Sequence, residues 1–116
     1  MKNRDSTLSL LDILESTRLI EKYIRNYSFE DFSANRLLQD GILRRLEIIG
    51  EAVKQLPKDI RDAYPDIPWK DIAGMRDILA HEYFRTDLSL AWRVCETEIP
   101  KLKRTLCRLL KQMENK

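Results

Sequence analysis

Hydrophobic residues in the first quarter of the chain recur at three- and four-residue steps, the period of an amphipathic helix. The pattern predicts a first helix over residues 6–27, whose other faces carry Glu and Arg. Its apolar row comprises Leu10, Ile13, Ile20, Ile24 and Tyr27, with Thr17 in the middle. No stretch of the chain alternates cleanly between apolar and polar residues, as a half-buried strand does. The hydrophobic pattern therefore predicts an all-α protein.

A second long helix is predicted to end at about Leu56, because Pro57 cannot continue it. Its apolar row comprises Leu38, Ile42, Leu46, Ile49, Val53 and Leu56. Residues 28–34, between the first two helices, break the periodic pattern. Ser28 or Ser33 is the predicted N-cap of the second helix, since a serine hydroxyl can accept a hydrogen bond from a free backbone N–H of the first turn.

Three prolines shape the middle of the chain. Pro57, Pro65 and Pro68 bracket a short helical turn over residues 58–64 and the extended link that follows it. Pro68 also suits the start of a third helix, which is predicted to carry residues 71–83.

A final helix is predicted over residues 87–113, capped by Thr86 or Asp87 and kinked at Pro100. These elements form an antiparallel bundle of four main helices plus one short extra helix, within a single domain over residues 1–116. No apolar run approaches the ~20 residues of a membrane span, and no signal-peptide core follows Met1. A cytoplasmic protein without membrane contact is therefore expected.

The formal net charge is only +2, but the charge is unevenly distributed. Six basic residues and one acid, Glu114, lie between Lys101 and Lys116. A helix of this kind could contact the phosphates of a nucleic acid or an acidic partner. It could also be a solvated cationic face that is favourable to the helix dipole, and on this run alone that is the commoner explanation.

The two cysteines, Cys95 and Cys107, are predicted to share the last helix, where ~18 Å separates them. That distance is too long for a disulfide. We therefore expect free thiols that act as small core residues, as in a reducing cytoplasm.

His81 is the only histidine of the chain and lies in the segment Arg76 to Tyr83. Asp77 precedes it by four residues, so on a helix the carboxylate can accept a hydrogen bond from the imidazole and raise the basicity of the ring. Arg76 precedes His81 by five residues, ~140° around and ~7.5 Å along a helix. The arginine and the histidine would thus flank a groove, and a phosphate fits between them.

These residue types suit RNA cleavage by the adjacent ribose 2′-hydroxyl. Histidine serves as acid or base near neutral pH, and arginine stabilises charge on phosphoryl oxygens. Tyr83 could bind phosphate or stack on a base. On spacing alone, a lone histidine near a helix end is more often a cap or surface residue, and the cluster can be an ion-pair network. One histidine and two separated cysteines do not make a zinc site within one chain, so no metal or cofactor is expected.

Gly50 and Gly74 lie inside predicted helices, where glycine costs ~1 kcal/mol relative to alanine. They are predicted to mark close approaches between helices, which at Gly74 would hold the helix that carries Arg76 rigidly. Trp69 and Trp92 are predicted to be core or interface anchors.

Several segments resemble one known family. Arg76, His81 and Tyr83 match the signature of the HEPN superfamily, and the chain more specifically resembles HepT, the toxin of HepT/MNT toxin–antitoxin pairs. The resemblance extends to IIGEAVK (48–54), YPDIPW (64–69), IAGMRD (72–77) and HEYF (81–84), and it covers essentially the whole chain.

The resemblance implies an all-α bundle that forms a homodimer or higher oligomer, with the Arg76–His81 segments of two protomers facing each other. It implies a metal-independent endoribonuclease in which Arg76 and His81 are catalytic and Asp77 orients the histidine. It further implies a type VII HepT/MntA system, in which a minimal nucleotidyltransferase (MNT) antitoxin neutralises the toxin by AMPylation of the motif tyrosine, here Tyr83.

Two other functions stay open at this point. The cleft between Arg76 and His81 could bind nucleotide or RNA without cutting it, as a non-catalytic accessory subunit of a nucleotidyltransferase does. The chain could also be a purely structural interaction bundle.

Overall fold

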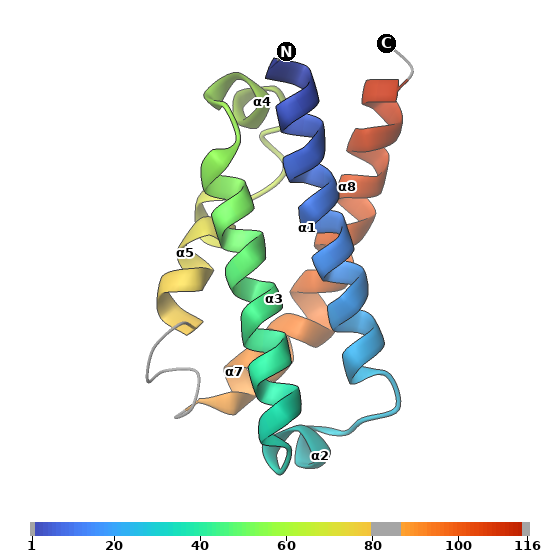
Figure 1. Ribbon diagram of the computed structural model, residues 1–116, viewed down its shortest axis with the longest axis vertical. Coiled ribbons are helices and arrows are strands. Elements are labelled where there is room, and N and C mark those ends of the chain that lie inside the picture. The colour runs from blue at the N-terminus through green and yellow to red at the C-terminus, as the bar shows by residue number, and fades with distance from the viewer. Residues whose placement is uncertain (1, 80–86, 115–116) are drawn as a thin grey trace.

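The computed structural model describes the backbone of residues 2–79 and 87–114, and the side chains of residues 7–74 and 87–114. Every regular element in these ranges is a helix, which confirms the all-α prediction. The Cα atoms span 46 × 26 × 21 Å, and the long helices lie side by side along the longest direction (Figure 1). None of the described helices is long and apolar enough to cross a membrane.

Helix α1 (Lys2–Ile24) runs antiparallel to helix α3 (Arg36–Gln55), and the two pack together through their predicted apolar rows (Figure 1). The fully buried members of these rows are Leu10, Ile13, Ile20, Ile42, Leu46, Ile49 and Val53. The prediction for Tyr27 was wrong, because α1 ends at Ile24 and the Tyr27 side chain is 46% exposed. Asn26 has a φ of 68°, the left-handed conformation that commonly follows the end of a helix.

A short helix, α2 (Phe29–Ser33), occupies the segment in which the sequence pattern breaks. Ser28 caps this helix: its hydroxyl accepts from the Asp31 backbone N–H at 3.1 Å, and the Asp31 carboxylate accepts from the Ser28 N–H at 2.9 Å. This reciprocal pair is a capping box, and it satisfies two backbone donors that a helix of this length would otherwise leave to water.

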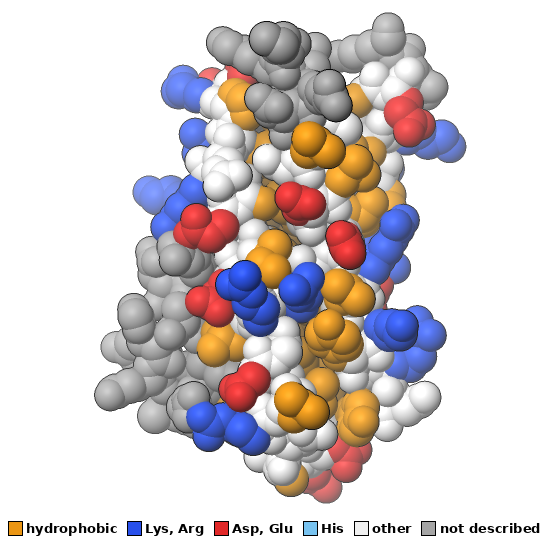
Figure 2. Space-filling model, in the orientation of Figure 1, with side chains coloured by type: hydrophobic (Ala, Val, Ile, Leu, Met, Phe, Trp, Pro, Cys, Tyr) orange, Lys and Arg blue, Asp and Glu red, His pale blue; other side chains and the backbone are white. Residues whose placement is uncertain are grey.

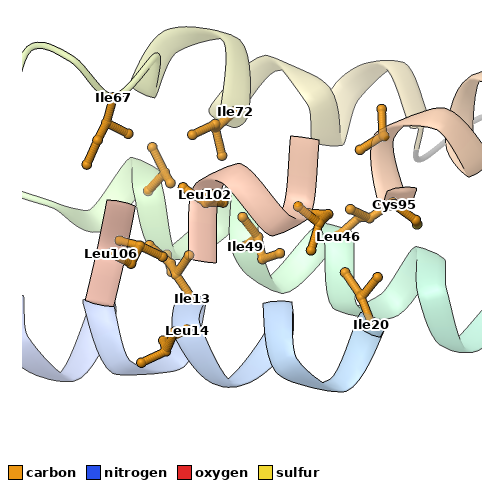
Figure 3. Packing of buried hydrophobic residues seen from close by; sticks show 14 of the residues in the cluster. Ile13, Leu14, Ile20, Leu46, Ile49, Ile67, Ile72, Cys95, Leu102 and Leu106 are labelled. Atoms are coloured by element: carbon orange, nitrogen blue, oxygen red, sulfur yellow. The ribbon is translucent and has the colours of Figure 1, made fainter. Parts of the chain in front are cut away.

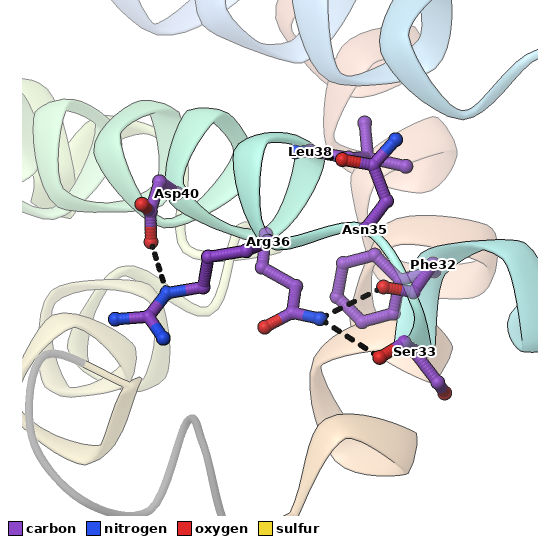
Figure 4. A network of polar contacts seen from close by, with 7 residues as sticks. Phe32, Ser33, Asn35, Arg36, Leu38 and Asp40 are labelled. Atoms are coloured by element: carbon purple, nitrogen blue, oxygen red, sulfur yellow. Dashed lines mark hydrogen bonds and ion pairs between the residues drawn. The ribbon is translucent and has the colours of Figure 1, made fainter.

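The N-cap of α3 is Asn35, whose side-chain oxygen accepts from the Leu38 N–H at 3.0 Å (Figure 4). The prediction that Ser28 or Ser33 caps this helix was therefore wrong. The buried Gln39 side chain donates to the carbonyls of Phe32 and Ser33 at 2.9 and 3.1 Å, so it ties α3 to the end of α2 (Figure 4).

The prolines act as the sequence predicts. Helix α3 ends at Gln55, two residues before Pro57, and helix α4 (Lys58–Ala63) is the predicted short turn. Helix α5 (Trp69–Leu79) begins directly after Pro68 and packs along α3.

The last helical stretch is divided into helix α7 (Leu88–Arg93), a π-helical turn η1 (Val94–Glu98) and helix α8 (Ile99–Glu114). At the end of η1 the Ile99 N–H donates to the Val94 carbonyl, five residues earlier. The π-helical turn ends at Glu98, two residues before Pro100, whose ring nitrogen has no hydrogen to donate to the preceding turn. The chain changes direction between α7 and α8 (Figure 1), so the predicted kink is present as a π-helical turn.

Helix α8 closes the core. It packs against α1, and its buried residues are Ile99, Leu102, Leu106 and Leu109. Figure 3 shows Leu102 and Leu106 among side chains of α1, α3 and α5, including Ile13, Ile49 and Ile72. Helices α1, α3, α5 and α8 thus contribute to one core, to which α2, α7 and η1 add buried residues such as Phe32 and Trp92.

We expect Leu106→Ala to lower the free energy of unfolding by about 2–5 kcal/mol, because the Leu106 side chain is fully buried and its removal leaves a cavity. Urea denaturation followed by circular dichroism measures this change. The control is Leu37→Ala on α3, which removes the same atoms from a side chain that is 84% exposed and should change stability by less than about 0.5 kcal/mol. Equal losses in the two variants would contradict this description of the core.

Candidate active site

The first half of the Arg76–Tyr83 motif lies on α5. Arg76 and Asp77 belong to the last turns of this helix, but their side chains lie outside the described residues. His81 and Tyr83 also lie outside the described residues. The predicted groove between Arg76 and His81, and the predicted bond between Asp77 and His81, therefore stay predictions. What the structure defines is the framework on both sides of the motif.

The N-terminal end of α5 is anchored by Trp69, whose side chain is only 7% exposed. The Trp69 indole Nε1–H donates to the Tyr64 carbonyl at 3.1 Å, and the Trp69 backbone N–H donates to the Ile67 carbonyl at 2.8 Å. The Ile72 N–H then donates to the Pro68 carbonyl at 3.0 Å and closes the first helical turn. These bonds confirm Trp69 as a core anchor and fix where the helix starts.

The side of α5 that packs against the core is held by Ile72, which is 5% exposed. Ile72 and Ile67 point toward Leu102 of α8 and Ile49 of α3 in the core (Figure 3). Arg76 follows Ile72 by one helical turn. The backbone at Arg76 is therefore positioned by apolar packing one turn away from it.

Gly74 does not mark a close approach between helices within the chain. A Cβ atom added at Gly74 would meet no heavy atom within 4 Å, so the predicted tight contact was wrong. The described residues therefore give no steric reason for glycine at this position.

The C-terminal side of the motif is anchored by α7. Asp87 is the N-cap of this helix, as the sequence predicts: its carboxylate accepts from the Ser89 hydroxyl at 2.6 Å and from the Leu90 N–H at 3.1 Å. These two bonds hold the pKa of Asp87 below its usual value of 3.8. The cap's contribution to stability is therefore complete above pH 3.8. It is lost as the pH falls through the lower pKa that Asp87 has in the folded protein.

Farther along α7, the side chain of Trp92 is only 8% exposed. It packs on Phe32 with ring centroids 5.3 Å apart and so holds α7 against the core. The second tryptophan is thus also a core anchor, as predicted. Residues 80–86 are joined at one end to α5, which Trp69 holds, and at the other to α7, which Trp92 holds.

The two cysteines differ in their surroundings. Cys95 is fully buried, and burial, with a smaller contribution from Glu96, raises the pKa of its thiol to about 12. At neutral pH this thiol is protonated and is a poor nucleophile. Both cysteines are free, as predicted, but Cys107 is exposed, so the prediction of a second core cysteine was wrong.

No group of three or more His, Cys, Asp or Glu side chains within the described ranges is arranged to hold a metal ion. His81 lies outside these ranges, so the expectation of a metal-free site stays a prediction.

Comparison with known proteins identifies the family. Residues 13–109 match the family model described as "Ribonuclease HepT-like". This match covers most of the chain and includes the whole Arg76–Tyr83 motif. The chain therefore belongs to the HepT-like ribonuclease family, which confirms the resemblance found in the sequence.

Named relatives agree with this assignment. "Probable ribonuclease HepT" of Thermococcus cleftensis is 45% identical over 94 residues, which cover 81% of this chain and 86% of that protein. "Putative RNase MJ1216" of Methanocaldococcus jannaschii is 43% identical over 116 residues, covering 100% of this chain and 96% of that protein.

A third relative is longer. "Gamma-glutamylcyclotransferase and putative RNase MJ0434" of Methanocaldococcus jannaschii is 45% identical over 111 residues, which cover 96% of this chain. The chain spans 50% of the length of that protein. No solved structure matches the chain.

We expect Gly74→Ala to raise the free energy of unfolding by up to about 1 kcal/mol, because alanine favours the helix and no described residue obstructs its methyl group. Urea denaturation measures the change. The control is Ala73→Gly in the neighbouring position of the same helix, which should lower stability by a similar amount. A destabilised Gly74→Ala variant would contradict the prediction and indicate that another copy of the chain packs closely at this point.

Proposed function

We propose that this chain is a metal-independent endoribonuclease toxin of a type VII HepT/MntA toxin–antitoxin system. The observation that carries the proposal is the family match, which spans the motif containing Arg76, His81 and Tyr83. The names of the relatives support the general activity, since each of those reported above contains the word RNase or ribonuclease. The chemistry of the motif supports the finer assignment.

The proposed reaction is an attack by a ribose 2′-oxygen on the adjacent phosphorus atom. The new bond joins the 2′-oxygen to phosphorus, and the bond from phosphorus to the 5′-oxygen breaks. The products are a 2′,3′-cyclic phosphate and a free 5′-hydroxyl. One group must take the proton from the 2′-hydroxyl and another must give a proton to the leaving 5′-oxygen, so no metal ion or redox partner is needed to balance the step.

His81 is proposed to carry the proton, because imidazole is the side chain whose ordinary pKa lies near neutral pH. Arg76 is proposed to bind the phosphoryl oxygens, because the guanidinium is planar and always charged. Asp77 would orient His81 if the α5 geometry continued past Leu79, since the two residues are four positions apart. These roles keep acid–base chemistry and charge stabilisation on separate side chains.

A second copy of the chain would complete the site. One imidazole cannot be base and acid at the same moment, whereas the two His81 side chains of a homodimer can divide these roles. An arrangement in which the motifs of two protomers face each other would also bring a second Arg76 to the phosphate. We therefore propose a homodimer or a higher oligomer built from such dimers, with each cleft shared between protomers.

The proposed control is AMPylation of Tyr83 by a minimal nucleotidyltransferase antitoxin. The Tyr83 hydroxyl oxygen would attack the α-phosphorus of ATP, pyrophosphate would leave, and the phenolic proton would pass to solvent. The added AMP carries negative charge and bulk two residues from His81. It would repel and obstruct an RNA phosphate in the cleft.

We expect His81→Ala and Arg76→Ala each to reduce RNA cleavage by roughly 10²–10⁴-fold, the usual range for loss of a general acid–base group and of a charge-stabilising group. The measurement is cleavage of labelled RNA, with and without excess EDTA, alongside growth after induced expression. Cleavage by the unchanged protein should persist in EDTA, and arrest of growth should require His81.

The matched control for the arginine is Arg93→Ala, which removes an exposed arginine from α7 and should leave cleavage unchanged. Circular dichroism shows that each variant retains its helices. Loss of cleavage in EDTA would contradict the metal-free mechanism. If the unchanged protein binds RNA without cleaving it, the chain is a non-catalytic accessory subunit. If it neither binds nor cleaves RNA, the remaining function is that of a structural interaction bundle.

We expect Tyr83→Phe to prevent AMP transfer while preserving the helical fold, because phenylalanine lacks the attacking oxygen. The measurement is the mass of the protein after incubation with the nucleotidyltransferase and ATP. Tyr27→Phe is the control, since it removes a hydroxyl from an exposed tyrosine on the α1–α2 connection and should still permit transfer. If the antitoxin still fully protects cells from the Tyr83→Phe protein, Tyr83 is not the residue through which the antitoxin neutralises the toxin.

A further inference from the structure

Positive charge is concentrated in two segments that are far apart in the sequence. Residues 18–25 and 99–113 together contain eight of the 21 cationic residues and only one of the 19 acidic residues, Glu21. The rest of the chain has thirteen cations and eighteen acids. Two segments with a strong positive excess therefore belong to a chain that is otherwise net negative, although the whole carries only +2.

Each segment arranges cations at the same helical spacing. Arg104, Arg108 and Lys111 of α8 stand at positions i, i+4 and i+7, and all three are exposed. Arg18, Lys22 and Arg25 repeat that spacing, also exposed, although Arg25 directly follows the last residue of α1. Seven residues of helix cover ~10.5 Å, so each row extends over about two turns. We call these six residues the basic face.

The two rows lie on neighbouring elements. Helices α1 and α8 pack together, and the Lys103 ammonium meets the Glu21 carboxylate between them at 2.6 Å. This pair engages the one acid within the two segments. In Figure 2, Lys and Arg side chains lie along the right-hand edge, where α1 and α8 lie in Figure 1, and others lie on the left and in the centre of this view.

Two grooves along the seam also join cations from both segments. A groove of about 840 Å³ is lined by Arg18 and Lys111, and a second of about 400 Å³ is lined by Arg25 and Lys103. Each groove also has two acids, Asp59 and Glu114 in the larger one and Glu21 and Glu96 in the smaller one, so cations and acids balance in both. The excess positive charge therefore comes from the members of the rows that line neither of these two grooves, which are Lys22, Arg104 and Arg108.

We propose that the basic face binds the phosphate backbone of RNA, at a place separate from helix α5, which carries Arg76. Within the described ranges, none of its six cations has an ion-pair partner. Cations without partners are available to replace the counterions of a polyanion, which is the main source of affinity for nucleic-acid backbones. This inference rests on the proposed ribonuclease function, because it concerns how that enzyme holds its substrate.

A polyanion fits the basic face better than a protein partner does. The cores of protein interfaces are apolar and depleted of charged residues, with charge at the rim. The six cations of the basic face are all exposed, although the larger groove beside them also has apolar side chains such as Leu11 and Met113. Phosphates repeated along a strand can engage such rows one after another.

The basic face and helix α5, which carries Arg76, lie on different sides of the molecule. Figure 1 shows α1 and α8 along one side and α5, which carries Arg76, along the other. The molecule is 26 Å wide in its middle dimension. At ~3.4 Å per nucleotide of a helical strand, an RNA that contacts both sides needs about eight nucleotides or more. The basic face should therefore matter for long substrates and not for very short ones.

The test is a double variant, Arg18→Gln with Arg104→Gln, which removes one cation from each row. Its matched control is Arg36→Gln with Arg44→Gln, which removes two exposed arginines from α3. Binding of an RNA of about 24 nucleotides is measured in a His81→Ala background, so that no cleavage is needed for the readout. The basic-face variant should bind roughly tenfold more weakly at low salt and reduce the slope of log K against log[salt] by about 1.4, while the control changes neither.

Kinetics with His81 intact provide the second readout. For the long RNA, the basic-face variant should raise KM and leave kcat unchanged. For an RNA of about four nucleotides, too short to reach the basic face, it should change neither. A lowered kcat on the short RNA would overturn the proposal, because it would place these arginines in the chemistry or in the stability of the site.

Several outcomes separate this inference from the proposed function. If the protein never cleaves RNA and only the basic-face variant binds RNA more weakly, the proposal for the basic face is supported and the proposed nuclease activity is contradicted. If the basic-face variant cleaves long RNA as well as the unchanged protein does, the nuclease activity is supported and the proposal for the basic face is overturned. Equal effects of the basic-face and control variants, or no RNA binding at all, would also overturn it. Unchanged RNA binding with weakened binding of the nucleotidyltransferase would assign the face to a protein and overturn the proposal.

Discussion

The fold depends on the burial of α1 between two other helices. One side of α1 packs against α3 and the adjoining side packs against α8, so its buried surface is wider than a single row. This explains why polar residues are buried in it. Thr17 is fully buried, and its hydroxyl donates to the Leu14 carbonyl at 2.6 Å. The Ser16 hydroxyl is buried and has no hydrogen-bond partner within the described residues, which costs ~1–3 kcal/mol that the surrounding apolar packing must offset.

The same packing explains which parts of the fold the sequence could predict. The long apolar rows and the prolines located α1, α3, α4 and the start of α5, since periodicity and missing N–H groups act locally. Helix α2 was missed, because five residues are too few to show a period and its evidence is the single capping box at Ser28 and Asp31. The π-helical turn was predicted only as a kink, because Pro100 disrupts the bonding of the preceding turn without dictating how the backbone reorganises.

Inferences about tertiary contacts were less successful than those about helices. A glycine inside a helix is compatible with close packing, but at Gly74 nothing lies within reach of a Cβ atom. For the candidate site, the sequence identified the motif and the family match supports it, whereas Arg76 is placed by the burial of Ile72 and Trp69 one and two turns before it. The row at Arg18, Lys22 and Arg25 attracted no attention in the sequence, because its meaning depends on α8 lying beside it, some eighty residues further along the chain.

Screening by salt determines how the basic face and the motif can influence each other. At physiological ionic strength the Debye length is ~8 Å, so a width of 26 Å corresponds to about three Debye lengths. Charges on the basic face therefore have little direct effect on groups at α5, on the other side of the molecule. In the proposed mechanism, Asp77 and Arg76 are the motif residues that would set the proton chemistry of His81. The basic face can act on the reaction only through a substrate long enough to contact both sides, so affinity and chemistry can vary independently in this fold.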